Sequence, residues 1–319
     1  MRIVFFGSPD YAVPSMRAVA SAGADLRLVV TQPDRPAGRK MHLQPPPVKS
    51  AAIELGIPVN QPESPNDPCV IDRIRAFEPD VFCGISYGEL LGKRLLAVPR
   101  LYPLNAHGSL LPRHRGASPI QGAIRSGDAE TGVTIMRMVR KLDAGDIGLT
   151  LRIPVAADET SITLHDKLAC LSATAFVKAI TLADAGALFF SAQDESQATY
   201  TRKLTRDDGV MDFTRPAVDL ERMVRAYTPW PSATANLTLN GKPTALKVLR
   251  ATLVSTDEKT DVKNAGEILA ADDARGLIVA CGSGALRLNE VQLPGRNRCS
   301  DVRLLEVCGG EKKIYVLNN

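Results

Sequence analysis

The stretch Leu104-Asn-Ala-His-Gly-Ser-Leu-Leu-Pro-Arg-His-Arg-Gly116 decides how the first half of the chain is interpreted. It continues Tyr102–Leu104, an apolar segment short enough for a buried strand, and it follows a second such segment at Asp80–Ile85. Asn105 and His107 are two positions apart, so their side chains leave an extended chain on the same face. Ligands of open α/β sheets bind beyond the carboxyl ends of the strands. The stretch therefore predicts an amide and an imidazole that meet a ligand together.

A carboxylate that can orient His107 follows at Asp143, within Leu142–Asp146 and beside the turn signal at Gly145. If the chain folds back there, Asn105, His107 and Asp143 supply a hydrogen-bond donor, a proton carrier and a group that orients it. The alternative is a strand end whose histidine merely caps a loop, because patterns this short also arise by chance.

Short apolar segments alternate with helical patterns over the first 185 residues. This alternation predicts a Rossmann-like parallel sheet covered by helices on both faces, in a domain at residues 1–186. Strands are expected at Ile3–Phe6, Leu26–Thr31, Val81–Ile85, Tyr102–Leu104 and Val133–Met138. Helices are expected after Asp10, near Asn66, over Glu89–Val98, over Ile120–Ser126 and over Leu164–Ala185. No Gly-x-Gly-x-x-Gly motif follows a strand, which disfavours a dinucleotide site.

A polar, unpatterned segment at residues 187–207 predicts a linker to a second domain at residues 208–319. This domain should open with one helix, Asp219–Ala226, and the pair Asn240-Gly241 indicates a hairpin between two strands. Further strands are expected at Ala265–Leu269, Leu277–Ala280, Leu286–Leu293 and Ile314–Leu317. Several short strands within such a length favour an OB-like β-barrel.

Gly84-Ile-Ser-Tyr-Gly88 matches the Gly-x-Ser-x-Gly nucleophile elbow of serine hydrolases. Ser86, Asp143 and His165 even follow the order of such a triad along the chain. However, His165 lies inside a strong helical pattern, and a hydrolase leaves Asn105 without a role. A tight turn after a strand is the favoured interpretation.

The segment Thr31–Lys49 is long and proline-rich for a plain connection, and such loops are usually functional or disordered. It carries Arg35, Arg39 and Lys40 with Asp34 as its one acidic residue. A solvated charged loop is one interpretation, and a basic flap over a bound polyanion is the functional one.

Composition narrows the class of protein. The chain has 319 residues, 45% of them hydrophobic, and a net charge of +4, which permits a polyanionic partner without requiring one. No apolar segment approaches the ~20 residues that span a bilayer, and Met1–Gly7 resembles a first strand rather than a signal peptide. We therefore expect a cytoplasmic protein that contacts no membrane. The six cysteines form no Cys-x-x-Cys pair and the four histidines have no ligand spacing, so no metal is expected.

The pattern Asn-x-His, then Ser-Leu-Leu-Pro, then a later Asp resembles the core of the formyltransferases that use 10-formyltetrahydrofolate. This resemblance implies that Asn105, His107 and Asp143 are catalytic and that the formyl donor is 10-formyltetrahydrofolate. It also implies that the folate is bound by the residues of the Ser-Leu-Leu-Pro segment, which are Ser109, Leu110, Leu111 and Pro112.

Two other segments resemble methionyl-tRNA formyltransferases: Pro33–Arg39, similar to their substrate loop, and Thr199–Leu204, similar to their domain junction. The resemblance implies formylation of the amino group of initiator methionyl-tRNA, for translation initiation, by an enzyme whose OB-like domain contacts tRNA. The implied tRNA-binding residues are basic, and they are Arg35, Arg39, Lys40, Arg202 and Lys203. We expect a monomer.

An alternative is a sugar-nucleotide N-formyltransferase that uses the same folate donor. Val139-Arg-Lys141 precedes Leu142-Asp143 where methionyl-tRNA formyltransferases usually have Asp-x-Gly, and this version is similar to the sugar enzymes. The basic segment Arg35–Lys40 and the second domain favour tRNA over a sugar.

Overall fold

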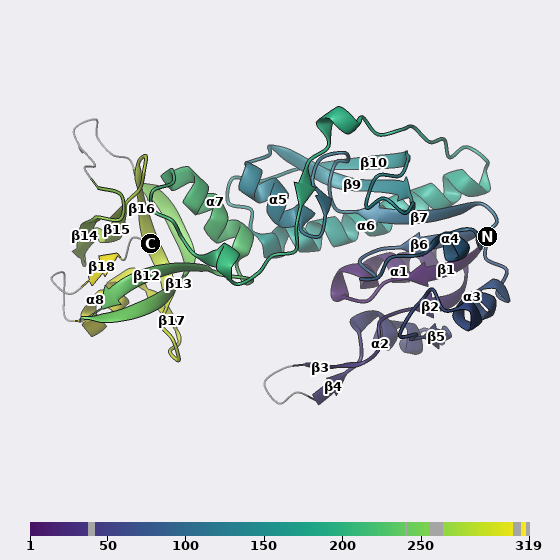
Figure 1. Cartoon of the computed structure of the whole chain (residues 1–319), viewed down its shortest axis with the longest axis horizontal. Coiled ribbons are helices and arrows are strands. Elements are labelled where there is room, and N and C mark those ends of the chain that lie inside the picture. Colours follow the sequence, from purple (N-terminus) through teal and green to yellow (C-terminus); the bar gives the residue numbers. More distant parts are fainter. Residues whose placement is uncertain (38–41, 240, 255–263, 309–313, 317–319) are drawn as a thin grey trace. The chain divides into compact units, whose positions relative to one another are not determined.

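The computed structural model describes residues 1–37, 42–239, 241–254, 264–308 and 314–316 (Figure 1). The chain divides into two compact units, neither of them continuous in sequence. The first unit comprises Met1–Pro119, Glu130–Pro154 and Leu164–Arg202, and the second comprises Ile120–Ala129, Val155–Thr163 and Lys203–Asn319. Most of the segment that was expected to be a linker thus belongs to the first unit.

The first unit is built on a seven-stranded sheet in the order β10-β9-β7-β6-β1-β2-β5. The strands are β1 (Arg2–Phe6), β2 (Asp25–Val30), β5 (Val59–Asn60), β6 (Val81–Gly84), β7 (Tyr102–His107), β9 (Glu130–Arg137) and β10 (Ile147–Pro154). Strands β5, β2, β1, β6 and β7 are parallel, which confirms the predicted fold class. By contrast, β9 and β10 are antiparallel to their neighbours. The loop joining β9 to β10 is too short for a crossover helix, so β10, which the sequence did not predict, returns antiparallel beside β9.

Helices cover both faces of this sheet. Phe5 of β1 packs against Phe176 of α6 (Ser161–Asp184), whereas Phe6, the next residue, points to the other face and packs with Ile71 and Ile74 of α3 (Pro68–Arg75). The same unit contains η1 (Asp10–Ala12), α1 (Val13–Ser21), α2 (Pro47–Glu54) and α4 (Lys93–Leu96). Consecutive strand residues point to opposite faces, so the apolar run of β1 supplies core on both sides.

The helix expected over Glu89–Val98 is shorter than predicted, because α4 spans only Lys93–Leu96. The side chain of Asn66 explains the difference. It donates to the carbonyl of Leu90 at 2.8 Å and accepts from the N–H of Gly92 at 2.6 Å, which fixes the residues before Lys93 as a loop. These two backbone groups are therefore satisfied outside a helix.

The long basic segment is not irregular throughout. Arg35–Ala37 (β3) and His42–Gln44 (β4) pair as an antiparallel hairpin. At its base, Asp34 accepts hydrogen bonds from Lys49 at 2.7 and 2.8 Å and from Gln61 at 2.7 Å. These bonds hold the pKa of Asp34 below its ordinary value, with the Gln61 bond the largest cause and the Lys49 bond the next.

The second unit is a mainly antiparallel sheet in the order β14-β15-β16-β13-β12-β18, with β17 paired to β16. The unit also contains α5 (Pro119–Ser126), except for its first residue, Pro119, which belongs to the first unit. Its other elements are η3 (Asp207–Gly209), α7 (Ala217–Tyr227), β12 (Ala233–Leu239), β13 (Lys242–Val254), β14 (Ile268–Asp272), β15 (Gly276–Ala280), β16 (Ala285–Gln292), β17 (Arg298–Ser300), α8 (Asp301–Cys308) and β18 (Ile314–Val316). The β12–β13 pairing confirms the predicted hairpin, although Asn240 itself lies outside the described residues. Of the two helices after residue 208, α7 was predicted and α8 was not. Closure of the sheet into an OB-like barrel stays a prediction.

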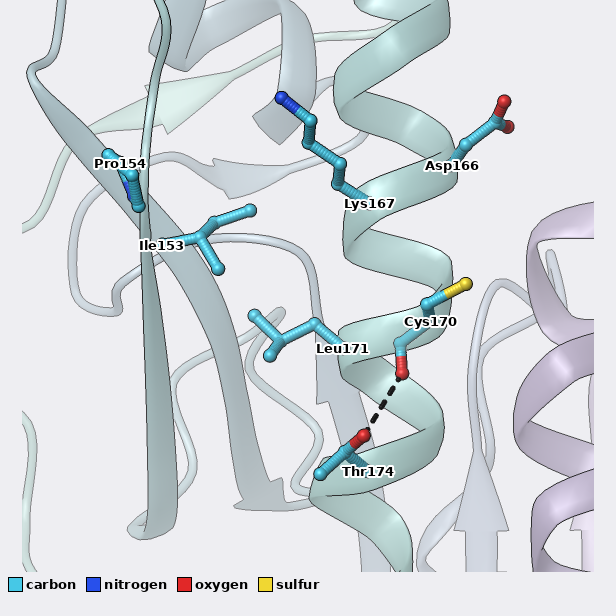
Figure 2. A pocket seen from close by; sticks show the side chains of 7 residues that line it. All are labelled: Ile153, Pro154, Asp166, Lys167, Cys170, Leu171 and Thr174. Atoms are coloured by element: carbon cyan, nitrogen blue, oxygen red, sulfur yellow. Dashed lines mark hydrogen bonds between the residues drawn. The ribbon is translucent and has the colours of Figure 1, made fainter.

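Within the described residues, no helix combines the length and the apolar composition that crossing a bilayer requires. A surface groove lies between β10 and α6, and Leu171 and Ile153 face each other across it (Figure 2). Its lining is otherwise formed by Pro154, Asp166, Lys167, Cys170 and Thr174. None of the residues predicted to be catalytic lines this groove, so the site must be sought elsewhere.

Candidate active site

Asn105 lies near the carboxyl end of β7, between β6 and β9. Its partner in β6 is Gly84, where an added Cβ would lie 3.3 Å from Asn105 Oδ1 and 3.1 Å from Met138 Sδ. The glycine therefore leaves room for the Asn105 amide. This side chain is partly exposed, and it forms no hydrogen bond with any residue that the structure describes. Strand β7 continues to His107 instead of ending at Leu104, so both polar residues are in the strand.

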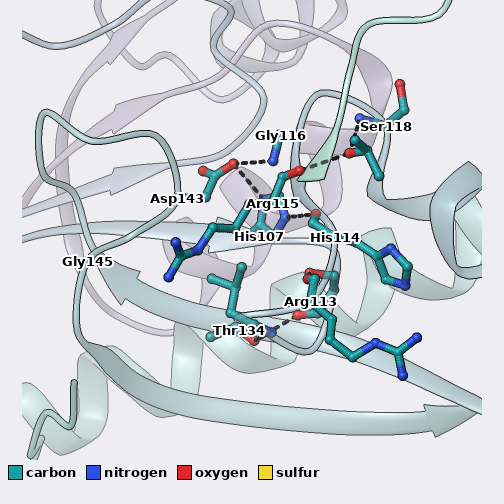
Figure 3. A network of polar contacts seen from close by, with 12 residues as sticks. His107, Arg113, His114, Arg115, Gly116, Ser118, Thr134, Asp143 and Gly145 are labelled. Carbon is teal, nitrogen blue, oxygen red and sulfur yellow. Dashed lines mark hydrogen bonds and ion pairs between the residues drawn. The ribbon is translucent and has the colours of Figure 1, made fainter. Parts of the chain in front are cut away.

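His107 is nearly buried, with 7% of its surface exposed, and the polar contacts around it are drawn in Figure 3. Its Nε2 lies 2.9 Å from the carbonyl oxygen of His114, and its Nδ1 lies 3.7 Å from Oδ2 of Asp143. Since a carbonyl oxygen can only accept, Nε2 carries the hydrogen in this contact. Nδ1 is then the ring nitrogen that can take up or release a proton beside the carboxylate.

Asp143 sits in the turn between β9 and β10 with φ of +51°, in the left-handed region. Its Oδ2 accepts the backbone N–H of Gly116 at 2.8 Å, which fixes this oxygen beside His107 (Figure 3). At Gly145, an added Cβ would lie only 1.8 Å from the carbonyl oxygen of Arg137, so the tight turn requires glycine there. The structure thus brings His107 and Asp143 together, as the sequence predicted.

The segment Ser109–Pro112, predicted to bind folate, is fixed largely by internal contacts. Ser109 is buried and its hydroxyl donates to the carbonyl of Arg113 at 2.6 Å. The hydroxyl of Thr134 donates to the carbonyl of Ser109 at 2.7 Å and accepts from the N–H of Leu111 at 3.2 Å. The side chain of Ser109 is therefore committed to the loop, and a folate contact by this segment stays a prediction.

Of the basic residues predicted to bind tRNA, the structure describes Arg35, Arg202 and Lys203. Arg35 is exposed on β3, with Nη2 3.5 Å from Oε1 of Gln32. Arg39 and Lys40 lie outside the described residues. Arg202 and Lys203 are exposed at the point where the chain passes from the first unit to the second. Their contacts with tRNA stay a prediction.

Arg115 is a part of the site that the sequence did not single out. Its side chain is fully buried. Its guanidinium donates to Glu195 at 2.9 and 3.1 Å, to the hydroxyl of Tyr200 at 3.0 Å, and to Oε1 of Gln193 at 2.7 and 3.0 Å. A buried charge of this kind needs such pairing. The partners come from the polar segment expected to be a linker, where no periodicity marks individual residues.

The same segment also pairs with the backbone of the central stretch. Tyr200–Thr201 (β11) lies parallel to Arg115–Gly116 (β8). Thr201 Oγ1 donates to the carbonyl of Arg115 at 3.0 Å and accepts from the N–H of Ser118 at 3.1 Å. Residues beyond 190, including η2 (Glu195–Gln197), are therefore bonded to the same loop that carries Gly116, the partner of Asp143.

Glu195 gives a testable pH dependence. The hydrogen bond from Arg115, and next that from Lys141, lower the pKa of Glu195 from its ordinary 4.5 to about 2. A folded-state pKa below the unfolded value means that this carboxylate adds stability above about pH 4.5, and that the gain disappears as the pH falls towards 2. Because Glu195 is half-exposed, solvent weakens the effect.

We therefore expect Glu195→Gln to lose less stability than the unmodified protein when the pH falls from about 5 to about 3. Urea unfolding at each pH measures the difference. Equal losses in the two proteins would contradict this role for Glu195.

The serine-hydrolase alternative is not supported. Ser86 is exposed with φ of +48°, in the turn after β6. His165, in α6, has Nδ1 2.9 Å from Asp166 and Nε2 3.7 Å from Asp10, while Asp143 faces His107. The histidine and the aspartate of the supposed triad are thus paired with other residues. The described residues also contain no cluster of three or more His, Cys, Asp or Glu side chains that could hold a metal.

Comparison with known families agrees with the fold. The chain matches the formyl transferase family over residues 1–180 and the formyl transferase C-terminal domain over residues 203–306. Among solved structures, a sugar 3N-formyl transferase, WlaRD, superposes with a TM-score of 0.66 at 15% identity, over 93% of this chain and 99% of its own. HypX from Aquifex aeolicus in complex with tetrahydrofolic acid has a TM-score of 0.59 at 16% identity, over 100% of this chain and 51% of its own. At such identities the likeness concerns the fold. The fold and the two family matches define a two-domain formyl transferase.

Sequence similarity is more specific. The methionyl-tRNA formyltransferase of Stutzerimonas stutzeri is 46% identical over 295 residues, which cover 92% of this chain and 91% of that protein. The chain belongs to the methionyl-tRNA formyltransferase family.

Proposed function

We propose that this protein transfers a formyl group from 10-formyltetrahydrofolate to the amino group of initiator methionyl-tRNA. The name and the coverage of the 46% identical relative support this substrate. The observation that carries the chemistry is the arrangement at the end of β7, where Asn105 has an uncommitted amide and His107 faces Asp143. We propose that the domain at residues 1–186 carries the catalytic side chains and that the domain at residues 208–319 contacts the tRNA of a monomeric enzyme.

The amine attacks the electrophilic formyl carbon of the donor and forms a new C–N bond before the bond from that carbon to the folate nitrogen breaks. The folate nitrogen takes up a proton as it leaves, and this balances the proton that the amine loses. Negative charge develops on the formyl oxygen. A preorganised donor aimed at that oxygen stabilises the charge, and the amide N–H of Asn105 is suited to this because no described residue occupies it. The amide thus acts as an oxyanion donor.

His107 moves the proton that the attacking amine must lose. With Nε2 donating to the carbonyl of His114, Nδ1 is the nitrogen available for proton exchange. Asp143 lies on the Nδ1 side, with Oδ2 3.7 Å from that nitrogen, where its carboxylate orients the ring. Because the nucleophile belongs to the substrate, Ser86 needs no role.

The formyl donor is proposed from the family and from two structural neighbours. Crystals of HypX were obtained with tetrahydrofolic acid, and those of WlaRD with 5-N-formyl-THF. The residues that fit a folate here are Asn105 and the loop Ser109–Pro112, whose backbone is fixed by Thr134. The exposed side chain of Arg35, with Arg39, Lys40, Arg202 and Lys203, is proposed to contact tRNA phosphates.

A formyl-transfer assay tests the proposal. Purified protein and 10-formyltetrahydrofolate are incubated with methionyl-tRNA, with deacylated tRNA, or with an amino-sugar nucleotide. We expect product only with methionyl-tRNA, and its formation should slow as salt rises because phosphate contacts are screened. Product with the amino-sugar nucleotide alone would refute methionyl-tRNA as the substrate but leave the proposed catalytic residues in place. No product with either would refute the proposed function.

A further inference from the structure

Gln193 is the side chain that ties the turn of Asp143 to the rest of the first unit. Its Nε2 donates to the carbonyl of Asp143 at 2.8 Å and to the carbonyl of Gly145 at 2.7 Å. One amide thus bonds two carbonyls of the same turn, on both sides of Ala144. The bonds join segments 48 and 50 positions apart in sequence, so local structure alone does not create them.

The turn needs such support because the backbone hydrogen bond that spans it, from the N–H of Ala144 to the carbonyl of Lys141, is long at 3.4 Å. Asp143 has a φ of +51°, in the left-handed region that residues other than glycine adopt less readily. It lies between β9 and β10, outside regular structure. Among the described residues, its carboxylate accepts one hydrogen bond, from the N–H of Gly116. A rotation of the peptide beside Asp143 would therefore move Oδ2 away from His107.

The amide of Gln193 can face only one way. Its Oε1 accepts from Nε of Arg115 at 3.0 Å and from Nη2 at 2.7 Å, and a guanidinium can only donate. Reversing the amide would place its NH₂ against Arg115 and its oxygen against two carbonyls. Because Arg115 is fully buried and also bonded to Glu195, it directs Nε2 of Gln193 towards the turn.

We propose that Gln193 is a positioning residue for formyl transfer, which acts by holding the turn so that the Asp143 carboxylate stays beside His107. This inference rests on the proposed function, because it assigns Asp143 a part in the reaction. The side chain of Gln193 forms hydrogen bonds with Arg115, Asp143 and Gly145 but with neither His107 nor Asn105. Its effect therefore passes through Asp143, and misplacing a catalytic group by about 1 Å can cost about 10²-fold in rate.

Two substitutions separate the two halves of the amide. Gln193→Met removes both the donor and the acceptor at similar length. Gln193→Glu keeps an acceptor for Arg115 but cannot donate to the carbonyls. We expect both to lower kcat by roughly tenfold to a hundredfold with little change in either KM. Gln197→Met is the matched control, because Gln197 lies on the same segment, is exposed, and bonds only Asp194 among the described residues.

A double-mutant cycle with Asp143→Asn distinguishes positioning from general damage. If Gln193 acts through Asp143, Gln193→Met should cost little further rate once Asp143 is replaced. Full loss in both backgrounds would overturn the proposal, as would normal kcat in Gln193→Glu. Should Gln193→Met fail to fold, Gln193→Glu in the same cycle gives the answer. Normal activity of Asp143→Asn alone would instead refute the proposed role of Asp143.

Discussion

Replacing Asn105 by alanine is expected to lower kcat by about 10²–10³-fold, the usual cost of removing one oxyanion donor. The amide lies at the carboxyl end of β7, beside the space that Gly84 leaves, and it is not engaged by any described residue. Its loss should therefore remove stabilisation of the transition state while leaving the sheet intact. KM for both substrates should change much less than kcat.

The measurement is single-turnover formylation of methionyl-tRNA, accompanied by thermal unfolding of each variant. Asn105→Asp is the companion variant, because it keeps the size of the side chain but replaces the donor by a carboxylate. We expect it to be at least as slow as Asn105→Ala, since a negative charge would oppose the developing oxyanion. Near-normal turnover in either variant would remove Asn105 from the mechanism.

Gly116→Ala is expected to disrupt both the fold around the site and the reaction. Gly116 has φ of +105°, and an added Cβ would lie 2.0 Å from the carbonyl oxygen of Thr201. Backbone atoms cannot yield as a flexible side chain can, so β8 and β11 would have to separate. The N–H of Gly116 would then leave the carboxylate of Asp143.

Gly186→Ala controls for the backbone conformation alone. Gly186 has φ of +68°, but an added Cβ there would meet nothing within 4 Å. It should cost only about 1–2 kcal/mol and leave activity unchanged. Thermal unfolding and kcat should therefore separate the two variants, with Gly116→Ala much less stable and nearly inactive. Equal effects in the two would show that the approach of Thr201 is unimportant.

The residues of the site that depend on local sequence patterns could be predicted from the sequence. The two-residue spacing of Asn105 and His107 fixes their common face, and β7 confirms it. The turn signal at Gly145 placed Asp143 correctly, because that turn requires glycine at the approach of Arg137. The helical pattern around His165 likewise excluded it from a triad in advance.

The sequence did not predict features that depend on distant partners. Arg115 and Gln193 lie 78 positions apart, and nothing in either neighbourhood indicates the other. The short length of α4 follows from Asn66, which lies 24 and 26 positions before its partners Leu90 and Gly92. The hairpin within Thr31–Lys49 is formed by two strands of only three residues each, too short to show a pattern in the sequence. These contacts are set by tertiary structure, which overrides local preference.

The pairing of β8 with β11 also sets when the enzyme can become active during its synthesis. A nascent chain that has reached residue 180 already contains Asn105, His107 and Asp143. It still lacks Gln193 and Thr201, whose bonds to the site span 48 to 86 positions. Synthesis proceeds from the N-terminus, so the site can be completed only after residue 201 has left the ribosome. A fragment cut at the end of the first family match would carry every proposed catalytic side chain and still be incomplete.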